Sequence, residues 1–163
     1  MDRRNVVMGL ALAGSGTLTA AATAQSSAAD PLIAAFAKTL SAHDMAAFAA
    51  LFADDYVNHQ TSAAAPSPPA GVTAKQATVA FFTARLKGLP DLSVTVEASL
   101  ANSDMAAASF VYSGTHQGVY LGVAPTGKSL RFTSCDIFRV RGGKIAEHWG
   151  MGDIAGTLAQ MKG

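Results

Sequence analysis

The sequence predicts an α+β fold in which helices come first and a curved, mainly antiparallel sheet then wraps around them. Apolar residues recur at helical spacing as far as Leu86, and from Leu92 onward they alternate with polar residues. This change of period separates a helical half from a strand half. A chain of 163 residues without an internal repeat favours one domain with a single core.

The beginning of the chain is typical of an export signal. Arg3 and Arg4 lie in a short charged head, an apolar stretch follows, and residues 22–24 are the small residues that a signal peptidase requires. We therefore expect a signal peptide over residues 1–24, a mature domain over 25–163, and a periplasmic or secreted protein. The arginine pair resembles the twin-arginine signal, and a general secretory signal is the alternative.

Three helices are expected ahead of the sheet. Asp30–Pro31 suits a helix start, because a carboxylate caps free N–H groups and proline fits the first turn. Asp44 is expected to cap a second helix that includes Phe52. A third helix is expected to begin at Thr73 and to end at Gly88.

Four strands are then expected to form the sheet, over residues 92–100, 106–116, 130–141 and 144–149. Gly142–Gly143 is expected to form the hairpin turn between the last two strands. After them, Asp153 is expected to cap a short terminal helix.

Composition excludes several classes of protein. Lys and Arg number 12 against 11 for Asp and Glu, and no basic run accompanies them, which argues against nucleic acid as a partner. No long apolar run follows the signal, so we expect no membrane contact after its cleavage. The single cysteine, Cys135, cannot form an internal disulfide. A pocket for a small apolar or aromatic molecule is the expected function of what remains.

Four stretches form a pattern in the strand half: Gly114-Thr115-His116-Gln117-Gly118, Pro125-Thr126-Gly127-Lys128, Asp136-Ile137-Phe138-Arg139-Val140 and Glu147-His148-Trp149. Together they resemble the SnoaL-like polyketide cyclase (ester cyclase) family, and the similarity runs from about Phe48 to the end. The resemblance implies the cone-shaped α+β barrel of the nuclear-transport-factor-2-like superfamily. It also implies aldol ring closure of a polyketide without cofactor or metal. Other proteins of that fold are isomerases, dehydratases and binding modules.

Asp136 and His116 are the candidate catalytic residues. Asp136 shares an otherwise apolar strand face with Phe138, and His116 shares a face with Tyr112. An aldol reaction needs a base for a carbon-bound proton, and partial burial raises the pKa of a carboxyl toward neutrality. With the resemblance, this predicts Asp136 as the general base and His116 as the group that orients the substrate carbonyl or shares the proton. A structural carboxylate and a hydrogen-bonded core histidine are the alternatives.

Further residues are expected to bind the substrate: Asn58, His59, Tyr112, Phe138, Trp149 and Asp153. Asp153 is also the second candidate for the base. His148 alternates out of phase with Trp149, so it is expected on the convex face of the sheet. Cys135 is out of phase with Asp136 and is expected to be inert.

His59, His116 and Asp136 are the residue types of a metal site with two histidines and one carboxylate. No local metal-binding spacing accompanies them, and the family that the chain resembles uses no metal. We therefore expect neither a metal nor another cofactor.

Three functions remain open. The first is a cofactor-independent acid/base enzyme that performs aldol-type cyclisation of a polyketide-like or ester substrate. The second is an exported, non-catalytic binding protein for an apolar small molecule, and the third is an isomerase or dehydratase of the same fold. Asp136 and His116 within one water molecule of each other favour an enzyme, and a wider separation favours the binding protein. The exposed face of such a sheet commonly pairs with a second copy, so a homodimer is expected.

Overall fold

The computed structural model describes residues 30–60 and 66–163. The predicted signal peptide, residues 1–24, lies outside the described residues, and so does the predicted capping side chain of Asp30. Export therefore stays a prediction. No helix in the described ranges is long and apolar enough to cross a membrane.

The order of elements confirms the α+β prediction, with one strand among the helices. The elements are α1 (Asp30–Ser41), α2 (Met45–Ala50), β1 (Phe52–Asn58), α3 (Ala74–Gly88), β2 (Ser93–Ala101), β3 (Met105–Thr115), β4 (Ser129–Arg141), β5 (Lys144–Gly152) and α4 (Ile154–Lys162). The four strands expected after Leu92 are all present, within a few residues of their predicted bounds.

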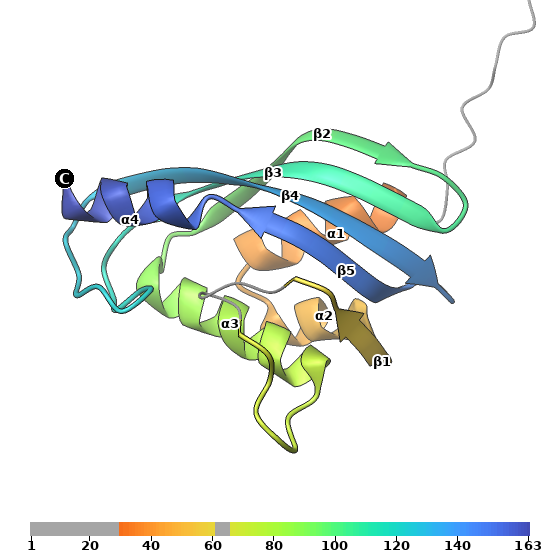
Figure 1. The fold of residues 1–163 in the computed structure, drawn as a ribbon. Coiled ribbons are helices and arrows are strands. Elements are labelled where there is room, and N and C mark those ends of the chain that lie inside the picture. The colour runs from red at the N-terminus through yellow and green to blue at the C-terminus, as the bar shows by residue number, and fades with distance from the viewer. Residues whose placement is uncertain (1–29, 61–65) are drawn as a thin grey trace, which may run out of the picture.

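The strands form one curved sheet in the order β1-β5-β4-β3-β2. Strands β2 to β5 pair antiparallel, and β1 pairs parallel with β5. The sheet curves over the first three helices but does not close, since β1 and β2 remain its two edges (Figure 1). The predicted cone is thus an open one, with helices on its concave side.

Strand β1 was not predicted. The sequence pattern placed Phe52 in the second helix, but α2 ends at Ala50 and Phe52 begins a strand. Phe52, Ala53 and Tyr56 are the buried residues of β1, so its apolar positions do not alternate. The register between β1 and β5 shifts after Phe52, and such an irregular edge strand gives no period-two signal.

The predicted N-terminal caps of α2, α3 and α4 are confirmed. The Asp44 carboxylate accepts the Ala47 N–H at 2.9 Å, and the Asp153 carboxylate accepts the Gly156 N–H at 2.7 Å. Thr73 and Gln76 exchange side-chain and backbone hydrogen bonds in a capping box.

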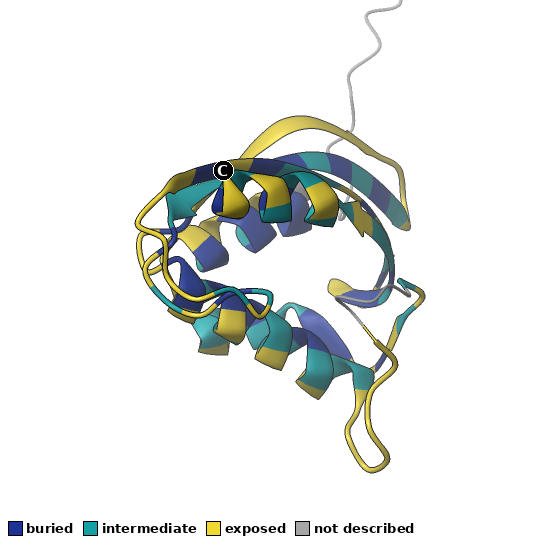
Figure 2. Ribbon diagram, turned by 60° about the vertical axis from the view of Figure 1, so that its left-hand side comes forward, coloured by how far each residue is buried: buried dark blue, intermediate teal, exposed yellow. Residues whose placement is uncertain are grey.

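An aromatic cluster fills the interior between the helices and the sheet. Phe36 of α1 lies with its ring centroid 4.9–5.6 Å from those of four other rings: Phe48, Phe82, Phe110 and Phe138. The concave face of the sheet and the inner faces of the helices are accordingly buried (Figure 2). A small pocket lies beside this cluster, between α3 and the strands β3 to β5.

Candidate active site

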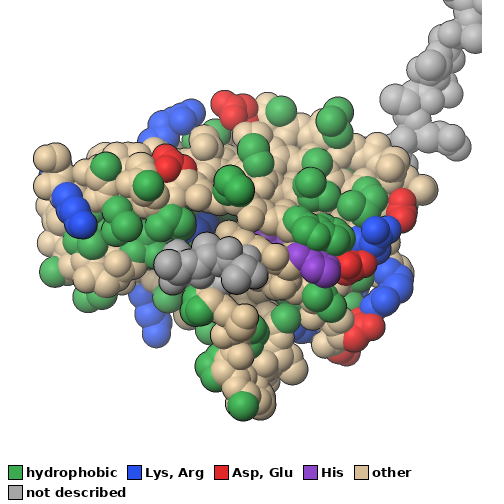
Figure 3. All heavy atoms as spheres, in the orientation of Figure 1, with side chains coloured by type: hydrophobic (Ala, Val, Ile, Leu, Met, Phe, Trp, Pro, Cys, Tyr) green, Lys and Arg blue, Asp and Glu red, His purple; other side chains and the backbone are tan. Residues whose placement is uncertain are grey.

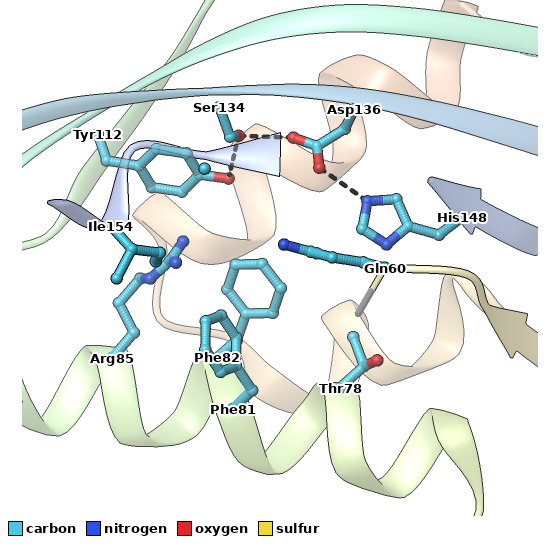
Figure 4. Close-up of a pocket in the computed structure, with 11 residues that line it drawn as sticks. Gln60, Thr78, Phe81, Phe82, Arg85, Tyr112, Ser134, Asp136, His148 and Ile154 are labelled. Carbon is cyan, nitrogen blue, oxygen red and sulfur yellow. Dashed lines mark hydrogen bonds and ion pairs between the residues drawn. The ribbon is translucent and has the colours of Figure 1, made fainter. Parts of the chain in front are cut away.

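A small pocket lies between helix α3 and the inner faces of β3, β4 and β5 (Figure 4). Measured as the space open to the centres of water molecules, its volume is about 50 Å³. Its wall is mostly apolar with a few polar groups, which is the usual make-up of a small-molecule site. The lining residues are Gln60, Thr78, Phe81, Phe82, Arg85, Tyr112, Ser134, Asp136, His148, Gly152 and Ile154.

A carboxylate–histidine pair forms one end of the pocket. Asp136 Oδ1 lies 2.7 Å from His148 Nε2, and Asp136 Oδ2 accepts the Ser134 hydroxyl at 2.5 Å. The side chains of Asp136 and His148 are only 8% and 11% exposed. Because an ionised carboxylate only accepts hydrogen bonds, Nε2 carries the proton that joins the pair. The His148 ring stacks on Phe138, which fixes its plane.

Gly150 makes room for this pair. It lies opposite Asp136 in the β4–β5 ladder and two residues after His148 on the same face. A Cβ atom at Gly150 would collide with Asp136 Oδ1 and with His148 Nε2. The absence of a side chain is therefore a steric requirement of the hydrogen bond.

The predicted orientation of His148 and Trp149 is wrong. Val140 pairs with Ile145 but Arg139 pairs with Glu147, so Ala146 is an extra residue in β5. This bulge reverses the alternation for the rest of the strand. His148 therefore faces Asp136 inside the cone, and Trp149 lies opposite Ile137 on the outer face.

The strand phase expected on β4 is confirmed, since Asp136 is buried and Cys135 is exposed. Tyr112 also lines the pocket as expected. Its hydroxyl oxygen lies 3.5 Å from that of Ser134, and burial raises the pKa of Tyr112 to about 12. Tyr112 thus keeps its proton at neutral pH.

His116 is buried as expected, but the structure does not bring it to Asp136. In the β3–β4 ladder Asp136 lies opposite Ala108, and His116 follows the far end of β3, roughly 25 Å away along extended backbone. His116 Nδ1 lies 3.0 Å from the Thr126 hydroxyl, and its backbone N–H bonds Lys128 O. Asp136 and His116 are therefore more than one water molecule apart, which is the separation expected for the binding protein. The histidine beside the carboxylate is instead His148.

The other expected binding residues lie outside the pocket lining. The His59 ring stacks on Trp149, with centroids 4.4 Å apart, and His59 Nε2 lies 2.8 Å from Glu147. Glu147 also forms an ion pair with Arg139, which in turn pairs with Asp104. Figure 3 shows acidic and basic side chains beside histidine at the right-hand side of the view.

Asn58, Phe138 and Asp153 each have a structural contact. The Asn58 side chain accepts the Gln60 N–H, Phe138 belongs to the aromatic core, and the exposed Asp153 caps α4. Within the described ranges no group of three or more His, Cys, Asp or Glu side chains is placed to hold a metal ion.

Sequence reasoning missed two polar residues of α3 that line the pocket, Thr78 and Arg85. With Phe82 between them they recur at helical spacing and form the buried face of α3. The helical spacing of Thr78 and Arg85 with Phe82 could have indicated that these two polar residues lie on the buried face of the helix. The hydroxyls of Thr78 and the neighbouring Tyr56 are buried without a hydrogen-bond partner in the described part of the chain, and burial raises the pKa of Tyr56.

A family model for the SnoaL-like polyketide cyclases matches residues 31–161. No curated protein matches the chain. Among solved structures, the chain is similar to IdmH from Streptomyces antibioticus, a candidate polyketide cyclase, with 29% identity and a TM-score of 0.70 over 82% of this chain and 98% of that one.

More distant structures share the fold. AclR from Streptomyces galilaeus, a candidate hydroxylase, is 23% identical with a TM-score of 0.68 over 82% of this chain and 80% of that one. A protein of ketosteroid isomerase-like fold from Catenulispora acidiphila is 22% identical with a TM-score of 0.61 over 80% of this chain and 92% of that one. The fold is therefore nuclear-transport-factor-2-like, and the comparisons support a small-molecule enzyme.

Proposed function

The chain belongs to the SnoaL-like polyketide cyclase family, and from this membership we propose that it performs cofactor-independent acid/base chemistry on a small molecule, with Asp136 as the general base. The reaction proposed is an aldol-type cyclisation of a polyketide-like or ester substrate. The observation that carries the proposal is the buried Asp136–His148 pair at the end of an otherwise mostly apolar pocket. An ionisable pair in such a place is typical of a catalytic site.

In this reaction Asp136 takes a proton from the carbon next to a substrate carbonyl, and the electron pair of that C–H bond forms an enolate. The enolate carbon then bonds to a second carbonyl carbon of the same molecule, whose oxygen becomes an alkoxide. The alkoxide takes the proton back from Asp136. Substrate and product therefore have the same composition, and the carboxylate is ionised again.

His148 is a positioning residue in this scheme. Its Nε2–H and the Ser134 hydroxyl each occupy one lone pair of Asp136. Each carboxylate oxygen keeps a second lone pair that can accept the substrate proton. Packing of the His148 ring on Phe138 holds the pair in one orientation.

Two donors are placed to stabilise the developing negative oxygen. The side chain of Gln60 reaches across the pocket toward its centre (Figure 4). The Thr78 hydroxyl lies in the same wall and is buried without a hydrogen-bond partner among the described residues. Donors already oriented in a pocket shielded from water stabilise an oxyanion more than water does.

The decisive experiment measures proton abstraction itself, because it does not require the product to be known. The protein is incubated in D₂O with a series of small aryl ketones and β-keto esters, and NMR follows replacement of the α-hydrogens by deuterium. We expect the wild type to accelerate exchange and Asp136→Asn to lower that rate by about 10²–10⁴-fold. His148→Phe should cause a smaller loss, because the base remains but is less well oriented.

Asp153→Ala is the matched control, since Asp153 was the second candidate for the base and caps α4. Its loss should lower the free energy of unfolding by about 1 kcal/mol and leave exchange unchanged. If Asp153→Ala abolishes exchange while Asp136→Asn does not, the base is Asp153. Exchange that the wild type does not accelerate, or that survives both Asp136→Asn and Asp153→Ala, would replace the enzyme by the binding protein. An isomerase or dehydratase would pass the same test, and product analysis would then separate it from a cyclase.

A further inference from the structure

Arg85 is a buried cation in the pocket wall, and no anionic side chain of the described residues pairs with it. It is 6% exposed, and none of the ion pairs among the described residues includes it. Removing a charge from water is costly unless an opposite charge or strong hydrogen bonds compensate it. The fold therefore keeps a buried charge in the wall of a pocket, where a bound anion could compensate it.

Neighbouring side chains hold the guanidinium in one orientation. Arg85 Nε donates to the Tyr120 hydroxyl at 3.0 Å. The guanidinium carbon lies 4.9, 4.8 and 4.7 Å from the ring centroids of Phe81, Phe82 and Tyr112. The rings favour the cation, and the hydrogen bond uses Nε, so the two Nη atoms remain as the donors for a ligand.

The pocket has a cation at one end and the carboxylate–histidine pair at the other. Figure 4 shows Arg85 beside Tyr112 and Ile154, at the end away from the Asp136–His148 pair. The two Asp136 oxygens accept hydrogen bonds from Ser134 and His148, and Asp136 forms no ion pair with Arg85. A ligand anion at Arg85 therefore lies apart from the single acidic side chain of the described lining.

We propose that the pocket takes a small aromatic carboxylate, with its carboxylate bound by the Nη atoms of Arg85 and its reacting carbon toward Asp136. A planar carboxylate matches the two parallel N–H groups of a guanidinium. Phe81, Phe82 and Tyr112 in the lining offer aromatic contacts to a flat ring. A neutral carbonyl oxygen would leave the buried charge uncompensated. This inference rests on the pocket of the proposed function and adds the class of its substrate.

Benzoate and benzamide are the matched probes, because they share shape and size but differ in charge. Isothermal titration calorimetry at pH 7 and low salt should show that the wild type binds benzoate at least about tenfold more tightly than benzamide. Arg85→Gln should abolish this preference. Arg131→Gln, which removes an exposed arginine elsewhere on β4, should leave it unchanged.

Two further variants keep the test decisive. Tyr120→Phe retains the guanidinium but removes its hydrogen bond, and should keep the preference for benzoate even if Arg85→Gln does not fold. Asp136→Asn should retain benzoate binding while losing α-proton exchange, so the ligand class and the proposed chemistry can fail separately. Equal affinity for the two probes in the wild type, no benzoate binding at millimolar concentration, or a preference that survives in folded Arg85→Gln would overturn the proposal.

Discussion

Gly150 has an ordinary backbone conformation, so a substitution there tests space alone. Gly150→Ala places a methyl group where the Asp136–His148 hydrogen bond lies, and the two side chains must separate. We expect the free energy of unfolding to fall by about 1–3 kcal/mol, as for other overpacked sites. The rate of α-proton exchange should fall as well. Urea unfolding and the NMR exchange assay measure the two effects.

Gly152→Ala is the control for this substitution. Gly152 lies in the same strand, and a Cβ atom there would come no closer than 3.9 Å to its neighbours. Its free energy of unfolding should match that of the wild type, which separates the collision at Gly150 from the effect of an added methyl group elsewhere in β5. If Gly150→Ala retains full exchange, the Asp136–His148 bond is not needed for the chemistry.

The alternation of residues along β3 and β4 predicted which side chains face the interior. It did not predict how far apart those side chains lie along the strands. Asp136 and His116 are both buried as the alternation required, yet they lie far apart because the ladder places Asp136 opposite Ala108. Residues 116–128 join β3 to β4, and a connection of that length leaves the register unspecified. A period of two residues therefore predicts which face of the sheet a side chain lies on. It does not predict which side chains of the neighbouring strand lie beside it.

At the scale of elements, the extra residue in β5 explains the error at His148. A regular register continued from the Gly142–Gly143 turn would place Trp149 opposite Asp136. The bulge at Ala146 places Gly150 opposite Asp136 instead. The bulge is not visible in the hydrophobic pattern, because Ile145 and Ala146 are both apolar and both buried. Nothing in the local composition distinguished the two registers.

The turn between α3 and β2 offers a test at the same scale. The Asp91 carboxylate accepts the Thr115 backbone N–H at 2.6 Å and the Thr115 hydroxyl at 2.7 Å, which ties this turn to the end of β3. These bonds, the backbone one first, lower the pKa of Asp91 below its ordinary 3.8. A carboxyl with a depressed folded pKa stabilises the fold above its unfolded pKa, and this stability is lost as pH falls through the folded pKa.

Asp91→Asn should therefore be less stable than the wild type at pH 7, and the difference should shrink as pH falls below 3.8. Urea unfolding of both proteins across that range measures it. Thr115→Val removes the hydroxyl donor, so Asp91→Asn should have a smaller effect in that background. A difference that is the same at all pH values would contradict the assignment to an ionised Asp91.

At the scale of the whole molecule, the pocket depends on contacts between distant segments. Arg85 comes from α3, Asp136 and His148 from neighbouring strands, and Gln60 from the segment after β1. The sequence identified the fold through its motifs, because each element carries its own periodicity. It did not identify which side chains meet, because that depends on the registers of the whole sheet and on the docking of α3.

The outer face of the sheet carries a row of apolar residues that the described part of the chain leaves exposed. In the ladder, Leu100 lies opposite Ala107, Ala107 opposite Ile137, and Ile137 opposite Trp149, so the row crosses four strands. Leu100 is 78% exposed and Ile137 44%. Contiguous exposed apolar residues of this kind mark an interaction surface.

We expect this row to bury itself against the same row of a second copy, which gives a homodimer with a self-complementary interface of about 800 Å² per partner. Ile137→Lys places a charge at the centre of the row and should convert the dimer to a monomer, measured by light scattering after size-exclusion chromatography. Val119→Lys, at an exposed apolar residue of the β3–β4 connection, should leave the dimer intact. A wild type that is monomeric at high micromolar concentration, or an Ile137→Lys variant that stays dimeric, would contradict the prediction. The pocket opens on the concave side of the sheet, so the monomeric variant should retain benzoate binding and α-proton exchange.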